Sequence, residues 1–114
     1  MKIHKIFGLD LGTTNSTASA IVDGKVFFAK DYDSSSIPSI VAVKNNALIV
    51  GKMARLEYIR NSHNAYKSIK RDMGKNKNIT IGALKKTPEE VSAAIIEYAA
   101  TLLNSQIKKE SNVI

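Results

Sequence analysis

The first third of the chain alternates short apolar blocks with polar turns, a pattern typical of β-structure. An apolar run at Ile6–Leu11 predicts a buried central strand. Thr17–Val22 and Lys25–Ala29 flank Asp23-Gly24, a dipeptide that favours a two-residue hairpin turn. We therefore expect three consecutive strands, followed by a polar loop at residues 30–36.

The middle of the chain predicts a second pair of strands and a short helix. Ser39–Val43 and Ala47–Val50 are apolar and enclose Lys44-Asn45-Asn46, which favours a turn. A short helix is expected at Lys52–Ile59. Between it and the last helix, Ile79–Ile81 is a further strand candidate.

The last helix has the clearest start signal in the sequence. Thr87 is a favourable N-cap, Pro88 suits the first turn, and Glu90 completes a T-x-x-E capping box. Apolar residues then recur at helical spacing, which predicts one face that packs on a sheet. That face consists of Val91, Ala94, Ile95, Tyr98, Leu102 and Ile107.

The segment Phe7–Ser16 carries the strongest candidate chemistry. Asp10 lies where the first strand ends, and a carboxylate there suits a hydrated cation such as Mg²⁺. Gly12 allows a tight turn and a close approach of the backbone to a ligand. The hydroxyls, amide and backbone N–H groups of residues 13–16 are donors for a phosphate tail. By composition alone, the same residues would make an ordinary hairpin turn. They match neither a P-loop nor a G-x-G-x-x-G turn.

This segment resembles the first phosphate-binding motif of the actin and sugar-kinase superfamily. In this form it is most similar to the seventy-kilodalton heat-shock chaperones, the DnaK family. Further stretches follow in the order and approximate spacing of those chaperones. They are Ile37–Ala42, Val50–Ala54, Ser68–Gly74 and Thr87–Ala93.

The resemblance implies an α/β fold of the actin-like ATPase (ribonuclease H-like) type. Residues 1–114 would form only the N-terminal part of its first lobe, a mixed sheet with packed helices, and the peptide-binding domain would be absent. The chain therefore resembles a fragment. By itself it is expected to bind ATP weakly or not at all and to show no appreciable ATPase activity.

The resemblance also assigns roles to individual residues. Lys70 would be catalytic and reach toward the γ-phosphate, with Arg71 secondary. Asp10 would hold Mg²⁺ through water and take part in catalysis. The phosphates would lie against Gly12, Thr13, Thr14 and Asn15, with Thr13 nearest the β- and γ-groups. For Ser16 we expect only a hydroxyl that satisfies the turn, and for His4 and His63 no metal.

The implied function is the ATP-binding part of a cytoplasmic molecular chaperone that couples Mg-ATP hydrolysis to binding and release of unfolded polypeptide. Its partners would be ATP, unfolded polypeptides, a J-domain co-chaperone and a nucleotide-exchange factor. The alternatives are a non-enzymatic truncated interaction module, a sugar or acetate kinase of the same superfamily, and an actin-like filament subunit.

The composition of the chain further limits the range of expected partners. The net charge of +7 would suit nucleic acid, but the lysines are scattered and the aromatic residues lie mostly in apolar patterns. There is no cysteine, which excludes a disulfide framework. Neither the apolar runs nor the N-terminus predicts a membrane span or a signal peptide. We therefore expect neither nucleic acid nor a membrane as a partner.

Two departures from the family pattern bear on the outer part of the lobe. Asn61–Ala65 lacks the proline and threonine that the family commonly has there. The segment between Gly74 and Thr87 is shorter than in typical members. The loop geometry and the outer subdomain are therefore expected to differ from the family.

Overall fold

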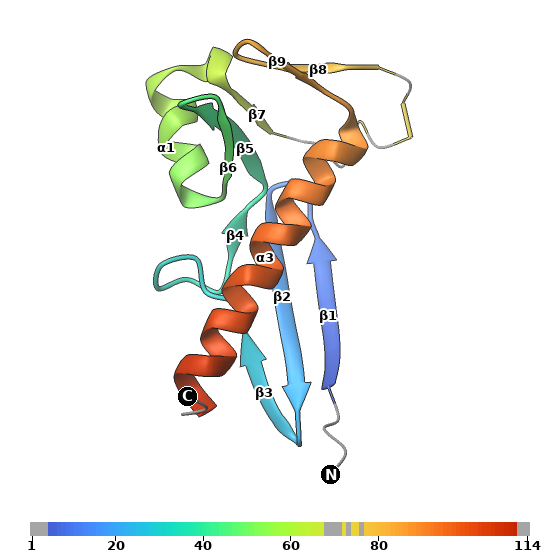
Figure 1. The fold of residues 1–114 in the computed structure, drawn as a ribbon, viewed down its shortest axis with the longest axis vertical. Helices are drawn as coiled ribbons and strands as arrows, with labels where there is room; N and C mark the ends of the chain where they lie inside the picture. The colour runs from blue at the N-terminus through green and yellow to red at the C-terminus, as the bar shows by residue number, and fades with distance from the viewer. Residues whose placement is uncertain (1–4, 68–71, 73, 76, 112–114) are drawn as a thin grey trace.

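The computed structural model describes residues 5–67, 72, 74–75 and 77–111 of the chain. Of the three antiparallel sheets among these residues, the two larger ones lie one beyond the other, and the long helix α3 (Pro88–Ser111) runs along both (Figure 1). The strands of the first sheet are β1 (Lys5–Leu11), β2 (Asn15–Val22), β3 (Lys25–Phe28) and β4 (Ile37–Pro38). The remaining elements are β5 (Ile40–Lys44), β6 (Ala47–Val50), α1 (Lys52–Arg60), the 3-10 turn η1 (Ser62–Asn64), β7 (Ala65–Lys67), β8 (Ile79–Ile81) and β9 (Leu84–Lys86).

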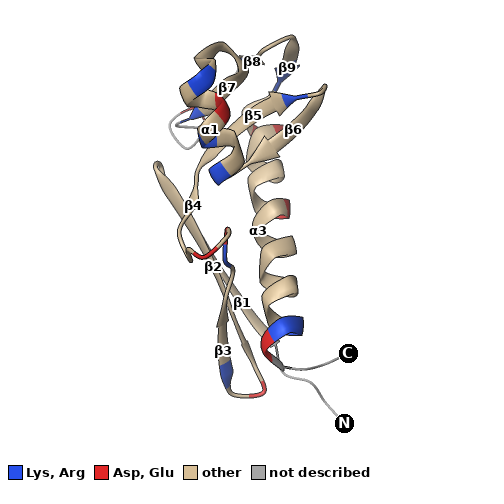
Figure 2. Cartoon of the chain, turned by 90° about the vertical axis from the view of Figure 1, so that its left-hand side faces the viewer, with Lys and Arg blue, Asp and Glu red and all other residues tan. Residues whose placement is uncertain are grey.

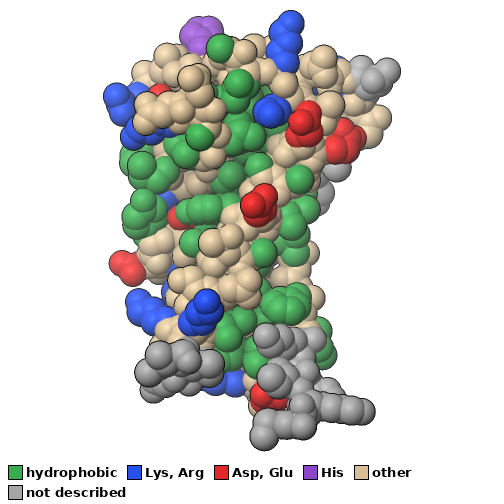
Figure 3. Space-filling model, viewed as in Figure 1, with side chains coloured by type: hydrophobic (Ala, Val, Ile, Leu, Met, Phe, Trp, Pro, Cys, Tyr) green, Lys and Arg blue, Asp and Glu red, His purple; other side chains and the backbone are tan. Residues whose placement is uncertain are grey.

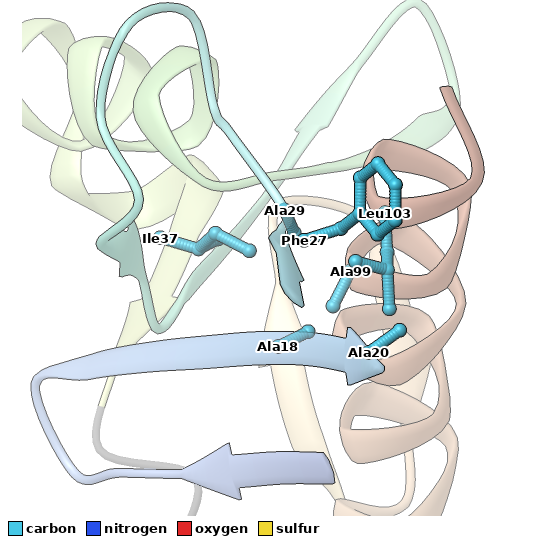
Figure 4. Close-up of a cluster of buried hydrophobic side chains, with 7 residues drawn as sticks. All are labelled: Ala18, Ala20, Phe27, Ala29, Ile37, Ala99 and Leu103. Carbon is cyan, nitrogen blue, oxygen red and sulfur yellow. The ribbon is translucent and has the colours of Figure 1, made fainter. Parts of the chain in front are cut away.

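The first sheet has the order β1-β2-β3, with β4 pairing with the start of β2. Alternate residues of β2 and β3 face α3, as the two-residue period of a strand requires. Phe27 and Ala20 lie opposite each other on that face and pack against Ala99 and Leu103 of α3 (Figure 4). This cluster holds the helix on one face of the sheet.

All strand pairs among the described residues are antiparallel, so the expected mixed sheet is wrong for this part of the chain. The connections give the reason. Asp23 and Gly24 both have positive φ, 50° and 84°, which is the two-residue hairpin turn that the sequence predicts. Turns this short join antiparallel strands, whereas parallel neighbours need a long crossover.

The position of β1 also differs from the prediction. Within the described residues β1 pairs only with β2, so it is an edge strand rather than a central one. Ile6, Phe7 and Leu9 are 66%, 57% and 44% exposed. An apolar run predicts a buried strand, but the sequence pattern shows only which residues are apolar and not which elements cover them.

The second sheet has the order β6-β5-β7 and is covered on both faces. One face packs on α1 through Ala42 and Ala54. The other face packs, through Val41, on Ile81 of β8 and Ile95 of α3. The β8–β9 hairpin lies in the segment that is short for the family, and Gly82 N donates to His63 O across to η1 (2.9 Å).

The start of α3 confirms the capping box. Glu90 N donates to Thr87 Oγ1 (3.1 Å), and Thr87 N donates to Glu90 Oε1 (2.9 Å). The predicted apolar face is also confirmed, since Val91 and Ile95 are fully buried and its other members are partly buried. The sequence did not predict β4, β7 or β9, which are short and are defined by their partners.

Charged side chains are spread over the molecule. Lys and Arg lie on α1, β3, β9 and the end of α3, not along one element (Figure 2). None of the helices in the described residues is both long and apolar enough to span a membrane.

Candidate functional site

The loop between β1 and β2 is built around Gly12. A Cβ added to Gly12 would collide with the carbonyl oxygen of Asn15, so the backbone can fold this tightly only without a side chain there. The tight fold brings the predicted phosphate-binding residues, Gly12 to Asn15, into one short turn. Gly12 thus allows the tight turn that the sequence predicts, while its close approach to a ligand stays a prediction.

Two buried serines fix the loop from behind. Ser39 Oγ donates to Gly12 O (2.9 Å), and Ser39 N donates to Thr14 O (2.9 Å). Ser16 Oγ lies 2.8 Å from Ser39 Oγ. Because the single hydroxyl proton of Ser39 goes to Gly12, Ser16 must donate to Ser39. Ser16 therefore satisfies the turn, as predicted.

Ser39 was missed as part of the site. It lies 27 residues after Gly12, and the sequence predicted it only as the first residue of a strand. The available signal was a single serine within the apolar run Ile37–Ala42. A buried hydroxyl needs a hydrogen-bond partner, so such a serine indicates a tertiary contact.

Polar side chains of the loop and of the end of β1 are candidates for binding a ligand. In the described part of the chain, the hydroxyls of Thr13 and Thr14 make no hydrogen bond with protein. Asp10 is exposed and lies opposite Thr17 on the sheet face that points away from α3. The loop thus presents hydroxyl donors beside a carboxylate, which suits an anion together with its cation.

The chemistry of these residues fits magnesium bound with a nucleotide better than a metal held by protein alone. No group of three or more His, Cys, Asp or Glu side chains comes together among the described residues. His63 is exposed, and His4 lies outside the described residues. Mg²⁺ typically keeps several waters and uses one or two carboxylates plus phosphates, a set that Asp10 could join.

The predicted catalytic Lys70 and the secondary Arg71 lie outside the described residues. Close to them in sequence, Asp72 is buried and pairs with Lys77 Nζ at 3.0 Å and with Lys75 Nζ at 3.5 Å. The hydrogen bond from Lys77, followed by smaller effects of both lysines, lowers the pKa of the Asp72 carboxyl despite its burial. Lys75 and Lys77 are thereby held by a carboxylate.

Asp31 is a buried carboxylate that the sequence did not single out. Its Oδ2 accepts from Lys52 N (2.8 Å), at the start of α1, and its Oδ1 accepts from the hydroxyl of Tyr98 (2.5 Å). Burial, and then this hydrogen bond, raise the pKa of the Tyr98 hydroxyl above its usual value. Asp31 thus joins the loop after β3 to α1 and to α3.

The loop at Asn61–Ala65, where the sequence departs from the family, has a defined geometry. Asn61 Oδ1 accepts from His63 N (3.1 Å) and caps η1. The chain then enters β7, which pairs with β5. An asparagine cap orders this loop without the family's proline.

Comparison with known proteins agrees with the earlier resemblance. Residues 6–102 match the family model described as Hsp70 protein. The chain is 34% identical over 118 residues to the chaperone protein DnaK of Methanothermobacter thermautotrophicus, a match that covers 95% of the chain and 20% of the relative. It is 36% identical over 114 residues to the chaperone protein DnaK of Mycoplasma mobile, covering 96% of the chain and 19% of the relative.

A third relative shows the same proportions. The chaperone protein DnaK of Mycoplasma mycoides subsp. mycoides SC is 37% identical over 99 residues, covering 86% of the chain and 17% of the relative. The chain thus spans about a fifth of the length of the curated relatives it matches.

Proposed function

Because the chain belongs to the Hsp70 family, we propose that it contributes one wall of a Mg-ATP site in an actin-like ATPase domain. The 114 residues would form the N-terminal part of the first lobe. The family match favours this function over the sugar-kinase and filament alternatives.

In this proposal the loop after β1 receives the phosphates. Thr13 and Thr14, with Gly12 and Asn15, would donate to phosphate oxygens, Thr13 nearest the β- and γ-groups. Asp10 would accept from waters around Mg²⁺, which supplies charge neutralisation on the transferring phosphoryl group. Lys70 would add a compact cation near the γ-phosphate.

One observation carries the proposal. Ser39 and Ser16 support the loop through buried hydrogen bonds, while the hydroxyls of Thr13 and Thr14 have no hydrogen-bond partner among the described residues and Asp10 is exposed. A turn that only joined two strands would not require a buried hydrogen-bond relay from a third segment. A preorganised set of donors does require such support, because their value depends on fixed positions.

The whole protein would act as a cytoplasmic chaperone. ATP hydrolysis would be coupled to the binding and release of unfolded polypeptide, with a J-domain co-chaperone and a nucleotide-exchange factor as partners. The sheet face away from α3 supports placement in a larger domain, since Ile6, Val26 and Phe28 on it are 66%, 50% and 50% exposed. Apolar surface of this extent marks contact with further protein.

The sharpest test places these residues in a complete domain. Residues 1–110 would replace the matching segment in the nucleotide-binding part of the Mycoplasma mobile DnaK relative. We expect the purified chimera to hydrolyse Mg-ATP in a single-turnover assay. A chimera that is folded by circular dichroism yet neither binds nor hydrolyses Mg-ATP would overturn the proposal.

Substitutions in the chimera separate the roles. Asp10→Asn should lower turnover about 10- to 100-fold, because a group acting through metal-bound water typically contributes that much. Lys70→Ala should lower it about 100- to 1,000-fold if its cation stabilises the transition state. Asp33→Asn is the matched control, since Asp33 is also an exposed aspartate but lies in the loop after β3. Equal losses for Asp10→Asn and Asp33→Asn would contradict the assigned role of Asp10.

The 114-residue chain alone should bind Mg-ATP weakly and turn it over at no appreciable rate, because it presents one wall of the cleft. An ATPase activity of this chain that is abolished by Lys70→Ala or Asp10→Asn would contradict that expectation. Amide chemical shifts during a Mg-ATP titration would show whether weak binding is centred on Gly12 to Asn15.

A further inference from the structure

The strand β6 forms an edge of the second sheet. The sheet order is β6-β5-β7, and within the described residues β5 is the only strand that pairs with β6. An unpaired edge presents backbone donors and acceptors that another strand can use. The turn that joins β5 to β6 determines which backbone groups of β6 point away from β5.

Asn45 and Asn46 form a two-residue hairpin turn, with φ of 53° and 63°. In such a hairpin the flanking residues, Lys44 and Ala47, form the first hydrogen-bonded pair. Pairs then alternate along the ladder, so the backbone N–H and C=O of Leu48 and Val50 point away from β5. The structure gives these outward groups no hydrogen-bond partner among the described residues.

The edge of β6 opens into a groove of about 540 Å³ between α1 and α3. Ala94, Tyr98 and Thr101 of α3 lie along one wall, and Met53 of α1 lies on the other. Figure 3 shows hydrophobic side chains gathered beside α3 in this part of the molecule. The groove therefore combines a free strand edge with apolar walls, as a strand-addition site requires.

The charge of the groove lining indicates which kind of ligand the groove favours. Glu97 of α3 is the one charged residue among those that line the groove, in a chain whose net charge is +7. Glu97 is exposed, and its carboxylate makes no hydrogen bond or ion pair in the described part of the chain. A basic side chain entering the groove would meet this carboxylate.

We propose that the β6 edge is a strand-addition site for an extended segment of a partner polypeptide that carries a basic residue opposite Glu97. Backbone pairing with Leu48 and Val50 supplies sequence-independent affinity, and the groove selects alternate side chains. This inference is independent of nucleotide binding, because none of the groove residues belongs to the loop after β1.

The test uses defined peptides and the 114-residue protein. The probe is a fluorescein-labelled peptide of seven residues, alternating Val and Thr with a central Arg, capped at both ends. Fluorescence anisotropy should show saturable binding below about 1 mM. Replacing the Arg of the peptide by Gln should weaken binding about five-fold, the upper range for an exposed ion pair.

Backbone pairing has its own signature. Successive residues of an extended peptide direct their N–H groups to opposite edges. Two peptides, N-methylated at odd or at even residues, should therefore differ: one loses about ten-fold or more in affinity, the other stays near the parent. Equal behaviour of the two peptides would overturn strand addition.

Variants of the protein locate the site. Glu97→Gln should weaken the Arg peptide about five-fold and leave the Gln peptide unchanged. Glu89→Gln removes the same charge from α3 outside the groove and should change neither affinity. Thr101→Trp, which fills the groove from an exposed position, should abolish binding while far-UV circular dichroism stays the same.

Three further outcomes would overturn the proposal. One is no binding of the Arg peptide by the folded protein. Another is binding that survives Thr101→Trp. The third is a doubling of molar mass in light scattering that Thr101→Trp abolishes, since a second copy of the chain would then be the occupant.

Discussion

The two sheets of this chain differ in how completely their apolar residues are covered. The second sheet lies between α1 on one face and the β8–β9 hairpin with α3 on the other, and Val41 and Ala42 at its centre are fully buried. The first sheet has α3 on one face, while its other face leaves Ile21, Val26 and Phe28 between 42% and 50% exposed. Both sheets carry apolar residues on both faces, but among the described residues only the second sheet has both faces covered by other elements.

This difference shows that the best-packed part of the chain and the candidate functional loop lie in different sheets. The covered sheet is a self-sufficient packing unit, since its apolar residues are removed from water by nearby elements. The candidate phosphate loop is attached to the other sheet, at the end of its exposed edge strand. The candidate chemistry thus lies in the part of the chain whose apolar surface calls for further contacts.

The largest expected effect compares the same substitution in the two sheets. Val41→Ala should lower the free energy of unfolding by about 2–3 kcal/mol, because it removes two buried methyl groups and leaves a cavity. Val26→Ala, at a position 50% exposed, should lower it by about 0.5 kcal/mol or less. Urea denaturation monitored by far-UV circular dichroism measures both. Similar losses would mean that the face around Val26 is covered in solution.

A second comparison tests Gly12, in the loop after β1, against Gly8 within β1. Gly12→Ala should lower the free energy of unfolding by about 2 kcal/mol, since the new Cβ collides with the backbone of Asn15. Gly8→Ala should change it by less than about 1 kcal/mol in either direction, because its Cβ would meet Ser19 Oγ at an ordinary 3.4 Å. The same denaturation curves decide this. An unchanged midpoint for Gly12→Ala would show that the loop relaxes freely and is not preorganised.

A third comparison concerns the contact that joins α3 to the loop after β3. Tyr98→Phe leaves the buried carboxylate of Asp31 without one of its donors and should lower the free energy of unfolding by about 1.5 kcal/mol. Tyr32→Phe is the control, because Tyr32 is 62% exposed and belongs to the same loop as Asp31. Equal, negligible effects would contradict the linking role of Asp31.

A structural feature could be predicted from the sequence when its interacting residues lie close together along the chain. The capping box and the hairpin turns were predictable because their partners lie within a few residues of each other. Asp31 was not, because it looked like one polar residue in a loop, whereas its partners are 21 and 67 residues away. No local pattern encodes contacts of that range.

The candidate site also has a part that the sequence predicted and a part that it did not. Gly12 to Asn15 are contiguous, so their residue types alone predicted a phosphate-sized turn. The support from Ser39 comes from a separate segment and required the folded chain. The edge position of β1 was missed for a related reason, since an apolar run does not reveal its cover.

The smallest expected effect concerns the capping box at the start of α3, which is a local feature and does not depend on how either sheet is covered. The pKa of Glu90 is lowered mainly by its hydrogen bond from Thr87 N. A folded pKa below the unfolded value of 4.5 means that Glu90 stabilises the fold above that pH. This stabilisation is lost as the pH falls through the lowered pKa of the folded state.

Glu90→Gln should therefore reduce the loss of stability between pH 7 and pH 3, measured by urea denaturation at several pH values. Glu89→Gln removes the same charge from the same helical turn, but the side chain of Glu89 makes no hydrogen bond in the described part of the chain. If both variants flattened the pH profile equally, the stabilising agent would be the helix dipole acting on any acid in the first turn rather than the capping box. A difference between them would place the effect in the two hydrogen bonds that join Thr87 to Glu90, which depend on neither sheet.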